Sequence, residues 1–226
     1  MKVGKSLKKE LWRLFGSREY PAESDGAVYG GGKLSQRFWE YFQALRYLDL
    51  DPDAVVLDIG GGSPVTGYGF FSHVLRRHVR QVLICDPNAG EAKERYDNIS
   101  FIRENADYDT LSRVFAKHPV THVASLSVFE HVMPEVRSGM IRAVEEHFTG
   151  DVFVATYEYH PVKVHFEQQL TTRTASEMFS HFKRFYLTEY SASPTLCENA
   201  FTEKGRWGHK AHIPNWYPVA VKFVRG

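Results

Sequence analysis

The sequence predicts an α/β domain built around a parallel sheet, and a βαβ pattern in its first half carries that prediction. The apolar run 55–57 is followed by Asp58 and by three consecutive glycines at 60–62. A short apolar run that ends in glycine is typical of a buried strand of a parallel sheet. Helical spacing follows over residues 70–77, and a second apolar run then ends in Asp86. Strand, glycine turn, helix and strand together form the pattern of a nucleotide-binding unit.

The glycine turn and the acid suit different parts of a nucleoside ligand. Glycines directly after a strand let the backbone approach a ligand without an intervening Cβ atom. An acid at the tip of the second strand, Asp86, can accept hydrogen bonds from both ribose hydroxyls. The dinucleotide pattern G-x-G-x-x-G that starts at Gly60 needs a further glycine where Val65 stands. The sequence therefore disfavours an NAD-linked oxidoreductase.

Length and composition narrow the remaining possibilities. With 226 residues, of which 43% are hydrophobic, the chain can bury one full core. The formal charge of +1 gives no general attraction to nucleic acid. There is no apolar run of about 18 residues to span a membrane, and the basic start lacks the apolar segment of a secretory signal. The two cysteines, Cys85 and Cys197, cannot build a disulfide framework, so we expect a reducing, cytoplasmic setting.

The first 48 residues are expected to form helices and a loop ahead of the βαβ pattern. Residues 1–20 fit a basic amphipathic helix that packs on the domain or contacts a membrane surface or a partner. The stretch 20–33, which contains Tyr29, is either a lid over the ligand or a connector. Ser35 is a candidate N-cap for a helix over residues 36–48. The expected apolar face of that helix consists of Phe38, Phe42, Leu45 and Leu48.

Strand and helix signals continue through the rest of the chain. Asp107 is a candidate N-cap for the helix after the third strand. Pro134 suits the first turn of a helix over residues 135–147, and a capping-box pattern begins at Thr174. Further strands are predicted at residues 99–102, from 122 onward, and at 151–156, 185–191 and 217–224.

Two motifs resemble those of the class I S-adenosylmethionine (SAM)-dependent methyltransferases. The stretch 58–62 has the order acid-x-Gly-x-Gly of the family's first motif, although Pro64 stands at its third glycine. Residues 125–132 read Ser-Leu-Ser-Val-Phe-Glu-His-Val, which is similar to the end of the fourth strand in many small-molecule members. Just upstream, Thr121 stands where the family often has an acid. The resemblance covers roughly residues 50–160.

The resemblance implies a Rossmann-like α/β fold with a seven-stranded, mostly parallel sheet, helices on both faces and a C-terminal antiparallel hairpin. It implies a single domain over residues 1–226, with a helical and lid segment at 1–48, a SAM-binding core at 50–160 and a C-terminal half at 161–226. The implied cofactor is SAM, with S-adenosylhomocysteine (SAH) as its product. The implied cofactor-binding residues are Asp58, Gly60, Gly61, Gly62, Asp86, Pro87, Ala106, Asp107, Ser125 and Tyr29.

Three polar side chains near the expected strand ends are candidates for the chemistry. A hydroxyl acceptor needs a base, and histidine titrates near neutral pH. His131 lies past the fourth strand beside Glu130; the alternative is that both residues cap the next helix or hold the SAM loop. His160 follows the fifth strand in a polar and aromatic cluster that suits an acceptor pocket. His160, His165 and Glu167 match no defined zinc spacing, so we expect no metal.

The segment 193–215 is long for a loop in a compact domain, so we expect it to contact the acceptor. Its aromatic and basic side chains suit a sugar or a phosphate. The favoured activity is therefore O-methylation of a sugar or glycoconjugate hydroxyl. The alternatives are N-methylation of an amine or a nucleic-acid base, and a SAM-fold protein that binds without catalysing. The expected partner is a small-molecule acceptor, with no nucleic acid and at most surface contact with a membrane.

Overall fold

The structure, a computed structural model, describes residues 33–62, 69–89, 96–160, 170–192 and 217–226. In chain order the elements are α2 (Lys33–Leu48), β1 (Val55–Ile59), α3 (Phe70–Leu75), β2 (Gln81–Cys85), β3 (Ile99–Ile102), α4 (Tyr108–Lys117), β4 (His122–Leu126), the 3-10 helix η1 (Phe129–His131), α5 (Pro134–His147), β5 (Val152–Tyr159), α6 (Thr172–Phe179), β6 (Phe185–Ala192) and β7 (Tyr217–Arg225). β1, α3 and β2 form the predicted βαβ unit.

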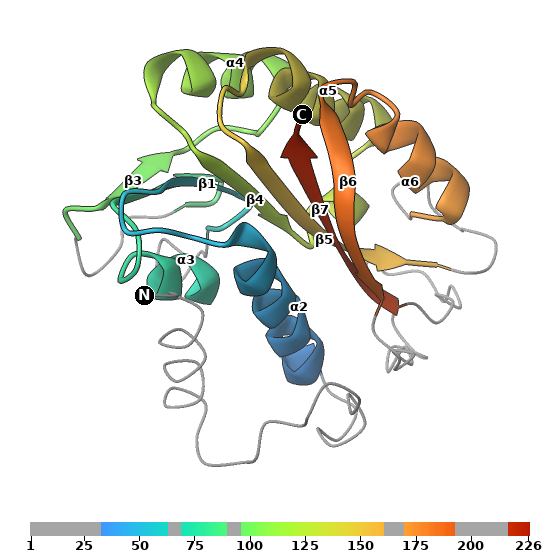
Figure 1. Cartoon of the computed structure of the whole chain (residues 1–226), viewed down its shortest axis with the longest axis horizontal. Helices are drawn as coiled ribbons and strands as arrows, with labels where there is room; N and C mark the ends of the chain where they lie inside the picture. The colour runs from blue at the N-terminus through green and yellow to red at the C-terminus, as the bar shows by residue number, and fades with distance from the viewer. Residues whose placement is uncertain (1–32, 63–68, 90–95, 161–169, 193–216) are drawn as a thin grey trace.

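The strands form one seven-stranded sheet in the order β3-β2-β1-β4-β5-β7-β6 (Figure 1). The first five strands of this order pair in parallel. β7 is antiparallel to both β5 and β6. This arrangement confirms the predicted mostly parallel sheet with a C-terminal antiparallel hairpin. It also brings the ends of β1, β2, β4 and β5 to one edge of the sheet, which we call the carboxyl edge.

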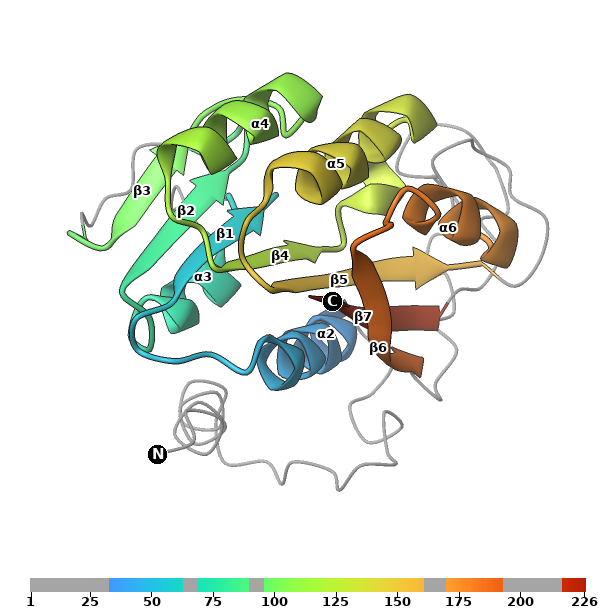
Figure 2. The same ribbon diagram turned by 45° about the horizontal axis from the view of Figure 1, so that its top comes forward.

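Helices cover both faces of the sheet: α2 and α3 lie on one face, and α4, α5 and α6 lie on the other (Figure 2). Side chains alternate between these faces along each strand. Leu57 packs in the core with Met140 of α5, whereas Val56 packs in the core with Leu48 of α2 and Phe71 of α3. Burial on both faces explains why the strands read as apolar runs rather than as alternating patterns.

Two helices begin earlier than the sequence predicts. α2 begins at Lys33, so Ser35 lies inside the helix and the prediction that it is the N-cap is wrong. α6 begins at Thr172, with Thr171 as its N-cap. The capping box therefore lies three residues before the predicted one, because the Thr171 N–H donates to Thr174 Oγ1 (2.8 Å) and the Thr174 N–H donates to Thr171 Oγ1 (3.3 Å).

The buried stripe of α2 also differs from the predicted apolar face. Phe42 and Leu45 are half-buried, and the Phe38 side chain lies outside what the structure describes. The residues that are fully covered are Glu40, Ala44, Tyr47 and Leu48. α2 contacts α3 as well as the sheet, and the ring of Tyr41 stacks on Phe71 with 5.6 Å between ring centroids. The buried stripe of α2 therefore follows its contacts with both the sheet and α3 rather than the spacing of its apolar residues alone.

β5 ends three residues later than predicted. It continues to Tyr159 because residues 157–159 keep antiparallel pairing with β7. The polar and aromatic cluster that was predicted to follow this strand therefore begins within it. Among the described residues of this cluster, only His160 comes after the strand, and its N–H donates to Leu170 O (2.8 Å).

Several predictions fall outside the described residues. These are the basic helix within 1–20, the lid or connector 20–33 with Tyr29 except for the last residue of that stretch, the segment 193–215, and the pair His165 and Glu167. Among the helices that are described, none is both long enough and apolar enough to cross a membrane.

Candidate functional site

The glycine loop and Asp86 meet at the carboxyl edge. The Gly62 N–H donates to Asp86 Oδ2 (3.1 Å), and the Asn88 N–H donates to Asp86 Oδ1 (2.7 Å). A Cβ atom at Gly62 would lie 2.8 Å from the Cγ of Asp86, so a side chain at this position would displace the acid. Each carboxylate oxygen accepts more than one hydrogen bond. Asp86 is thus held in place by the backbone while it retains the capacity to bind a ligand.

Gly60 joins the loop to the segment that follows β4. Its φ of +74° lies in the left-handed region that favours glycine. The Gly60 N–H donates to Cys85 O (2.9 Å), and a Cβ atom at Gly60 would overlap the side chain of Val128. The two motifs of the sequence, 58–62 and 125–132, therefore pack against each other where β1 and β4 end.

Asp58 lies beneath the loop, near the end of β1, and only 2% of its surface is exposed. Its Oδ2 accepts a hydrogen bond from Ser72 Oγ of α3, and a Cβ atom at Gly61 would overlap its carboxylate. Burial raises the pKa of Asp58 from 3.8 to about 7; the Ser72 hydrogen bond lowers this pKa and the charge of Asp86 raises it. A positive charge bound next to the loop would therefore favour the ionised form of Asp58.

A second buried carboxylate, Glu40 of α2, contacts the corner after β4, by which we mean residues 127–128. Glu40 is not among the site residues predicted from the sequence. Ser127 Oγ donates to Glu40 Oε1 (2.8 Å) and Oε2 (2.9 Å). The Ser127 N–H donates to Thr156 O (2.9 Å) and lies 3.2 Å from Thr156 Oγ1. The one sequence signal for Glu40 is its position four residues before Ala44, in the buried stripe of α2.

His131 and Glu130 lie on η1 and have different surroundings. His131 is exposed, and its N–H donates to Val128 O (2.8 Å). Glu130 is 7% exposed and interacts with α5 through Arg137. Burial lowers the pKa of Arg137, and the charge of Glu130 is the largest opposing influence. Of the two residues, His131 is the one that is open to an incoming molecule.

His160 lies at the end of β5 and is almost completely buried. Because β4 and β5 are neighbours in the sheet, the segments that carry His131 and His160 both follow strands that end at the carboxyl edge. In the described ranges, no three His, Cys, Asp or Glu side chains are grouped so that they could hold a metal ion.

The remaining predicted binding residues have mixed positions. Pro87 is exposed in the turn after β2, and Ala106 is half-buried against the core under α4–α6. Asp107 is the N-cap of α4 and its side chain accepts from the helix backbone (2.9 Å), which is the alternative role that the sequence left open. Ser125 is fully buried, and alternation along β4 puts it on the face of Val123, under α4–α6. Its Oγ has no hydrogen-bond partner among the described residues.

No protein-family model matches the sequence, and no curated protein is similar to it in sequence. Solved structures are similar in fold. The magnesium protoporphyrin IX methyltransferase ChlM from Synechocystis PCC 6803, solved with bound SAM, is 14% identical; the comparison covers 99% of this chain and 92% of that chain, with a TM-score of 0.53. The N-methyltransferase NodS from Bradyrhizobium japonicum WM9 is 13% identical over 85% of this chain and 98% of that chain, with a TM-score of 0.54.

A third similar structure, the cyclase SpnF, is 11% identical over 99% of this chain and 94% of that chain, with a TM-score of 0.59. At these identities the likeness establishes the fold, which is that of the class I SAM-dependent methyltransferases. Since one of the three is a cyclase, the fold by itself does not define the reaction.

Proposed function

We propose that this chain is a SAM-dependent methyltransferase that acts on a small molecule. The observation that carries the proposal is the contact between Gly62 and Asp86 at the carboxyl edge, directly above Asp58. This is the edge at which open α/β sheets bind their ligands. The fold and the residues at this edge thus support the same class of cofactor.

The residues present fit SAM. Asp86 sits at the tip of β2 with capacity for two more hydrogen bonds, which suits the two ribose hydroxyls. Residues 60–62 offer backbone without Cβ atoms, so the methionine part of SAM can lie close to the loop. Beneath that loop, the carboxylate of Asp58 favours the positively charged end of the cofactor. When bound, SAM supplies a methyl group activated by the sulfonium.

The protein's own contribution to such a transfer is alignment and proton removal. Methyl transfer needs the accepting atom, the methyl carbon and the sulfur in line, with water excluded. His131 is exposed beside the corner where β4 ends, so its imidazole can accept the proton of an acceptor hydroxyl. His160, at the end of the neighbouring strand, is almost completely buried, so it would act on the acceptor by supporting the residues that line the site.

For the acceptor, we propose a hydroxyl of a sugar or glycoconjugate. The support is the exposed histidine at the site and the aromatic and basic composition of residues 193–215. The near-neutral net charge disfavours nucleic acid as a partner. The cytoplasmic location that the cysteine content suggests stays a prediction.

A second candidate is N-methylation of an amine. Its support is the presence of two buried carboxylates, Asp58 and Glu40, at the carboxyl edge, because negative charge attracts an amine, which is protonated in solution. The amine must lose that proton before its nitrogen can accept the methyl group. The N-methyltransferase NodS shows that the fold accommodates this chemistry.

Methyl-labelled SAM incubated with separate pools of sugars and amines distinguishes the two candidates. We expect label transfer to the sugar pool, and transfer to amines alone would favour the second candidate. His131→Ala should lower turnover by about 10²-fold or more while SAM affinity is unchanged. His118→Ala is the matched control, because His118 lies between α4 and β4 at the opposite edge of the sheet. Equal loss of binding and turnover in His131→Ala would assign that residue a structural role.

A further inference from the structure

Ser127 has an unusual backbone conformation at the carboxyl edge. Its φ is +52°, and among the described residues the only other non-glycine residue at positive φ is Asp49. Asp49 is exposed after α2, and aspartate tolerates the left-handed region better than serine does. Ser127 is only 5% exposed, so the surrounding structure must hold it in a conformation that costs free energy.

Two elements hold Ser127 from opposite sides. The N–H is fixed by Thr156 of β5, and the hydroxyl is fixed by both carboxylate oxygens of Glu40 from α2. Glu40 is 0% exposed. Burying a carboxylate is costly, and an apolar side chain of similar size often gives a more stable fold. Its presence here is explained if it fixes the conformation of Ser127.

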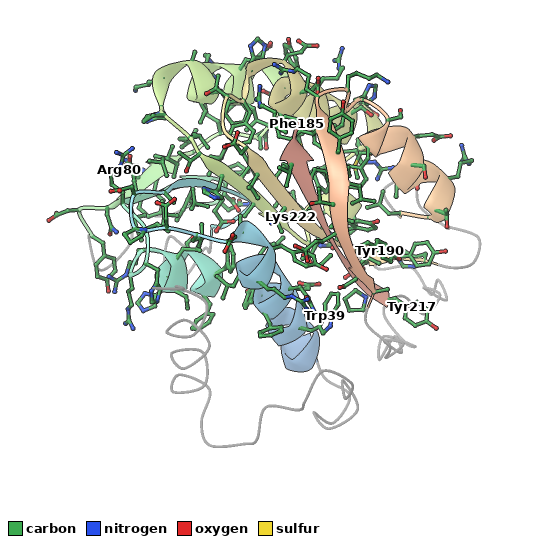
Figure 3. All side chains as sticks on the ribbon, viewed as in Figure 1. Trp39, Arg80, Phe185, Tyr190, Tyr217 and Lys222 are labelled. Carbon is green, nitrogen blue, oxygen red and sulfur yellow. The ribbon has the colours of Figure 1, made fainter. Side chains whose placement is uncertain are left out.

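The conformation of Ser127 is transmitted to the glycine loop and to η1 by the next residue. The Val128 side chain occupies the space beside Gly60, and its carbonyl oxygen accepts from the His131 N–H (2.8 Å). Rotation of the backbone at Ser127 would therefore move the neighbour of the loop and the start of η1 together. In Figure 3, Trp39 marks the part of α2 that carries Glu40. The labelled Tyr190 of β6 and Tyr217 of β7 lie on the same side of this view.

We infer that Glu40 is a positioning residue for the site: through Ser127 and Val128 it sets the glycine loop against β4. This inference rests on the proposed function for its consequence, which is cofactor affinity. It also has a consequence in the ligand-free protein, because the Gly60 N–H that donates to Cys85 O should open less often when the corner is fixed.

Hydrogen exchange of the ligand-free full chain tests the coupling. We expect Glu40→Ala to speed exchange about tenfold or more in both residues 58–62 and residues 127–131. The matched control is Glu145→Ala, because Glu145 is a buried carboxylate of α5 that accepts from the backbone of Lys183 (3.1 Å) and Arg184 (3.0 Å), away from the loop. The control should leave exchange in residues 58–62 unchanged. Unchanged exchange in residues 58–62 of Glu40→Ala would overturn the inference.

Two substitutions at Ser127 keep the test decisive if Glu40→Ala does not fold. Ser127→Ala removes the hydroxyl and keeps the left-handed backbone unfavourable, so it should reproduce the faster exchange. Ser127→Gly also removes the hydroxyl, but glycine adopts the conformation freely and should restore slow exchange. Equal exchange in the two variants would contradict a role in fixing φ.

Calorimetric titration of the same variants with SAH tests whether the effect of Glu40 on the glycine loop changes cofactor affinity. We expect Glu40→Ala and Ser127→Ala to weaken SAH binding about tenfold, with Ser127→Gly and Glu145→Ala within about twofold of the unmodified chain. If the variants exchange faster in residues 58–62 but bind SAH with normal affinity, the positioning role is refuted. Absence of SAH binding by the unmodified chain would refute the proposed function instead, and the exchange results would still decide whether Glu40 fixes the loop.

Discussion

The two faces of the sheet are packed with different chemistry. On the face of α4–α6, aromatic rings dominate: Phe153 lies 5.3 Å from Phe182, and Phe179 lies 4.8 Å from Phe223 between ring centroids. On the face of α2 and α3, two buried carboxylates are each hydrogen-bonded to a serine hydroxyl. These pairs are Asp58 with Ser72 and Glu40 with Ser127.

This difference in packing indicates that one face of the sheet mainly stabilises the fold and that the other also contributes to ligand binding. An aromatic core stabilises the fold by burying apolar area, and this contribution does not depend on the residues at the carboxyl ends of the strands. Buried acids weaken the fold when they are charged, and both of these acids lie at the carboxyl edge. We therefore expect substitutions of the aromatic rings on the α4–α6 face to change stability alone, and substitutions of the two buried acids on the α2 and α3 face to change ligand affinity as well.

The largest expected effect is on the aromatic face. Phe153→Ala should lower the free energy of unfolding by about 3–5 kcal/mol, because Phe153 is fully buried and contacts several rings. A melting temperature lower by roughly 10 °C in a thermal scan would match this cost. SAH affinity, measured by calorimetry at a temperature where the variant is folded, should stay within about twofold. A large loss of affinity in the folded variant would break the separation between the faces.

Asp58→Asn should have the opposite effect on stability. The pKa of Asp58 is raised by burial, from 3.8 to about 7. As pH rises between these values the unfolded chain loses the proton first, so the native chain loses stability and the full loss is present above pH 7. The shift corresponds to about 4 kcal/mol. Allowing for the cost of burying the amide, the variant should be more stable by about 2–3 kcal/mol at pH 8.

The same comparison at pH 4 should show no gain, since Asp58 is then protonated in the folded chain and partly protonated in the unfolded one. The cost of burying the amide remains at this pH, so the variant should be no more stable than the unmodified chain. Chemical denaturation at the two pH values measures both quantities. Asp58→Asn should also weaken SAM binding, because the carboxylate that favours positive charge is gone. A stability gain that is equal at both pH values would show that ionisation of Asp58 is not its cause.

The smallest of the three expected changes in free energy concerns SAH binding at the carboxyl edge, in the variant Asp86→Ala. Asp86→Ala should weaken SAH binding by at least about 30-fold, near 2 kcal/mol, because the ribose hydroxyls lose a charged acceptor. Its melting temperature should fall by only a few degrees, since the change removes two hydrogen bonds from the backbone and leaves the aromatic core intact. Asp97→Ala, in an exposed position before β3, is the matched control for calorimetry. Unchanged affinity in Asp86→Ala would remove the assignment of the ribose site.

The sequence was sufficient for most of the fold, because the central strands β1, β2, β4 and β5 are mostly buried and read as apolar runs. β3 begins and ends at the predicted residues, Ile99 and Ile102. The departure at Thr121 has a local explanation: its Oγ1 accepts from the Val55 N–H (2.9 Å) and ties the start of β4 to β1. Boundaries were wrong where pairing partners decide them, as at the end of β5.

The site could be predicted only where glycines and acids are adjacent in sequence. Residues 58–62 and Asp86 are identified by local pattern, and the structure brings them into contact. Glu40 lies 87 residues before Ser127, so only the packing of α2 on the sheet reveals their hydrogen bond. In the sequence Glu40 reads as one of several polar residues on an amphipathic helix.

Calorimetric titration of the full, unmodified chain with SAH, with NAD in parallel, tests the central claim most directly. If the carboxyl edge holds SAM, we expect SAH to bind with micromolar affinity and NAD to show no heat of binding. Binding of NAD without SAH, or of neither compound, would contradict the assignment of the edge to a SAM-dependent methyltransferase.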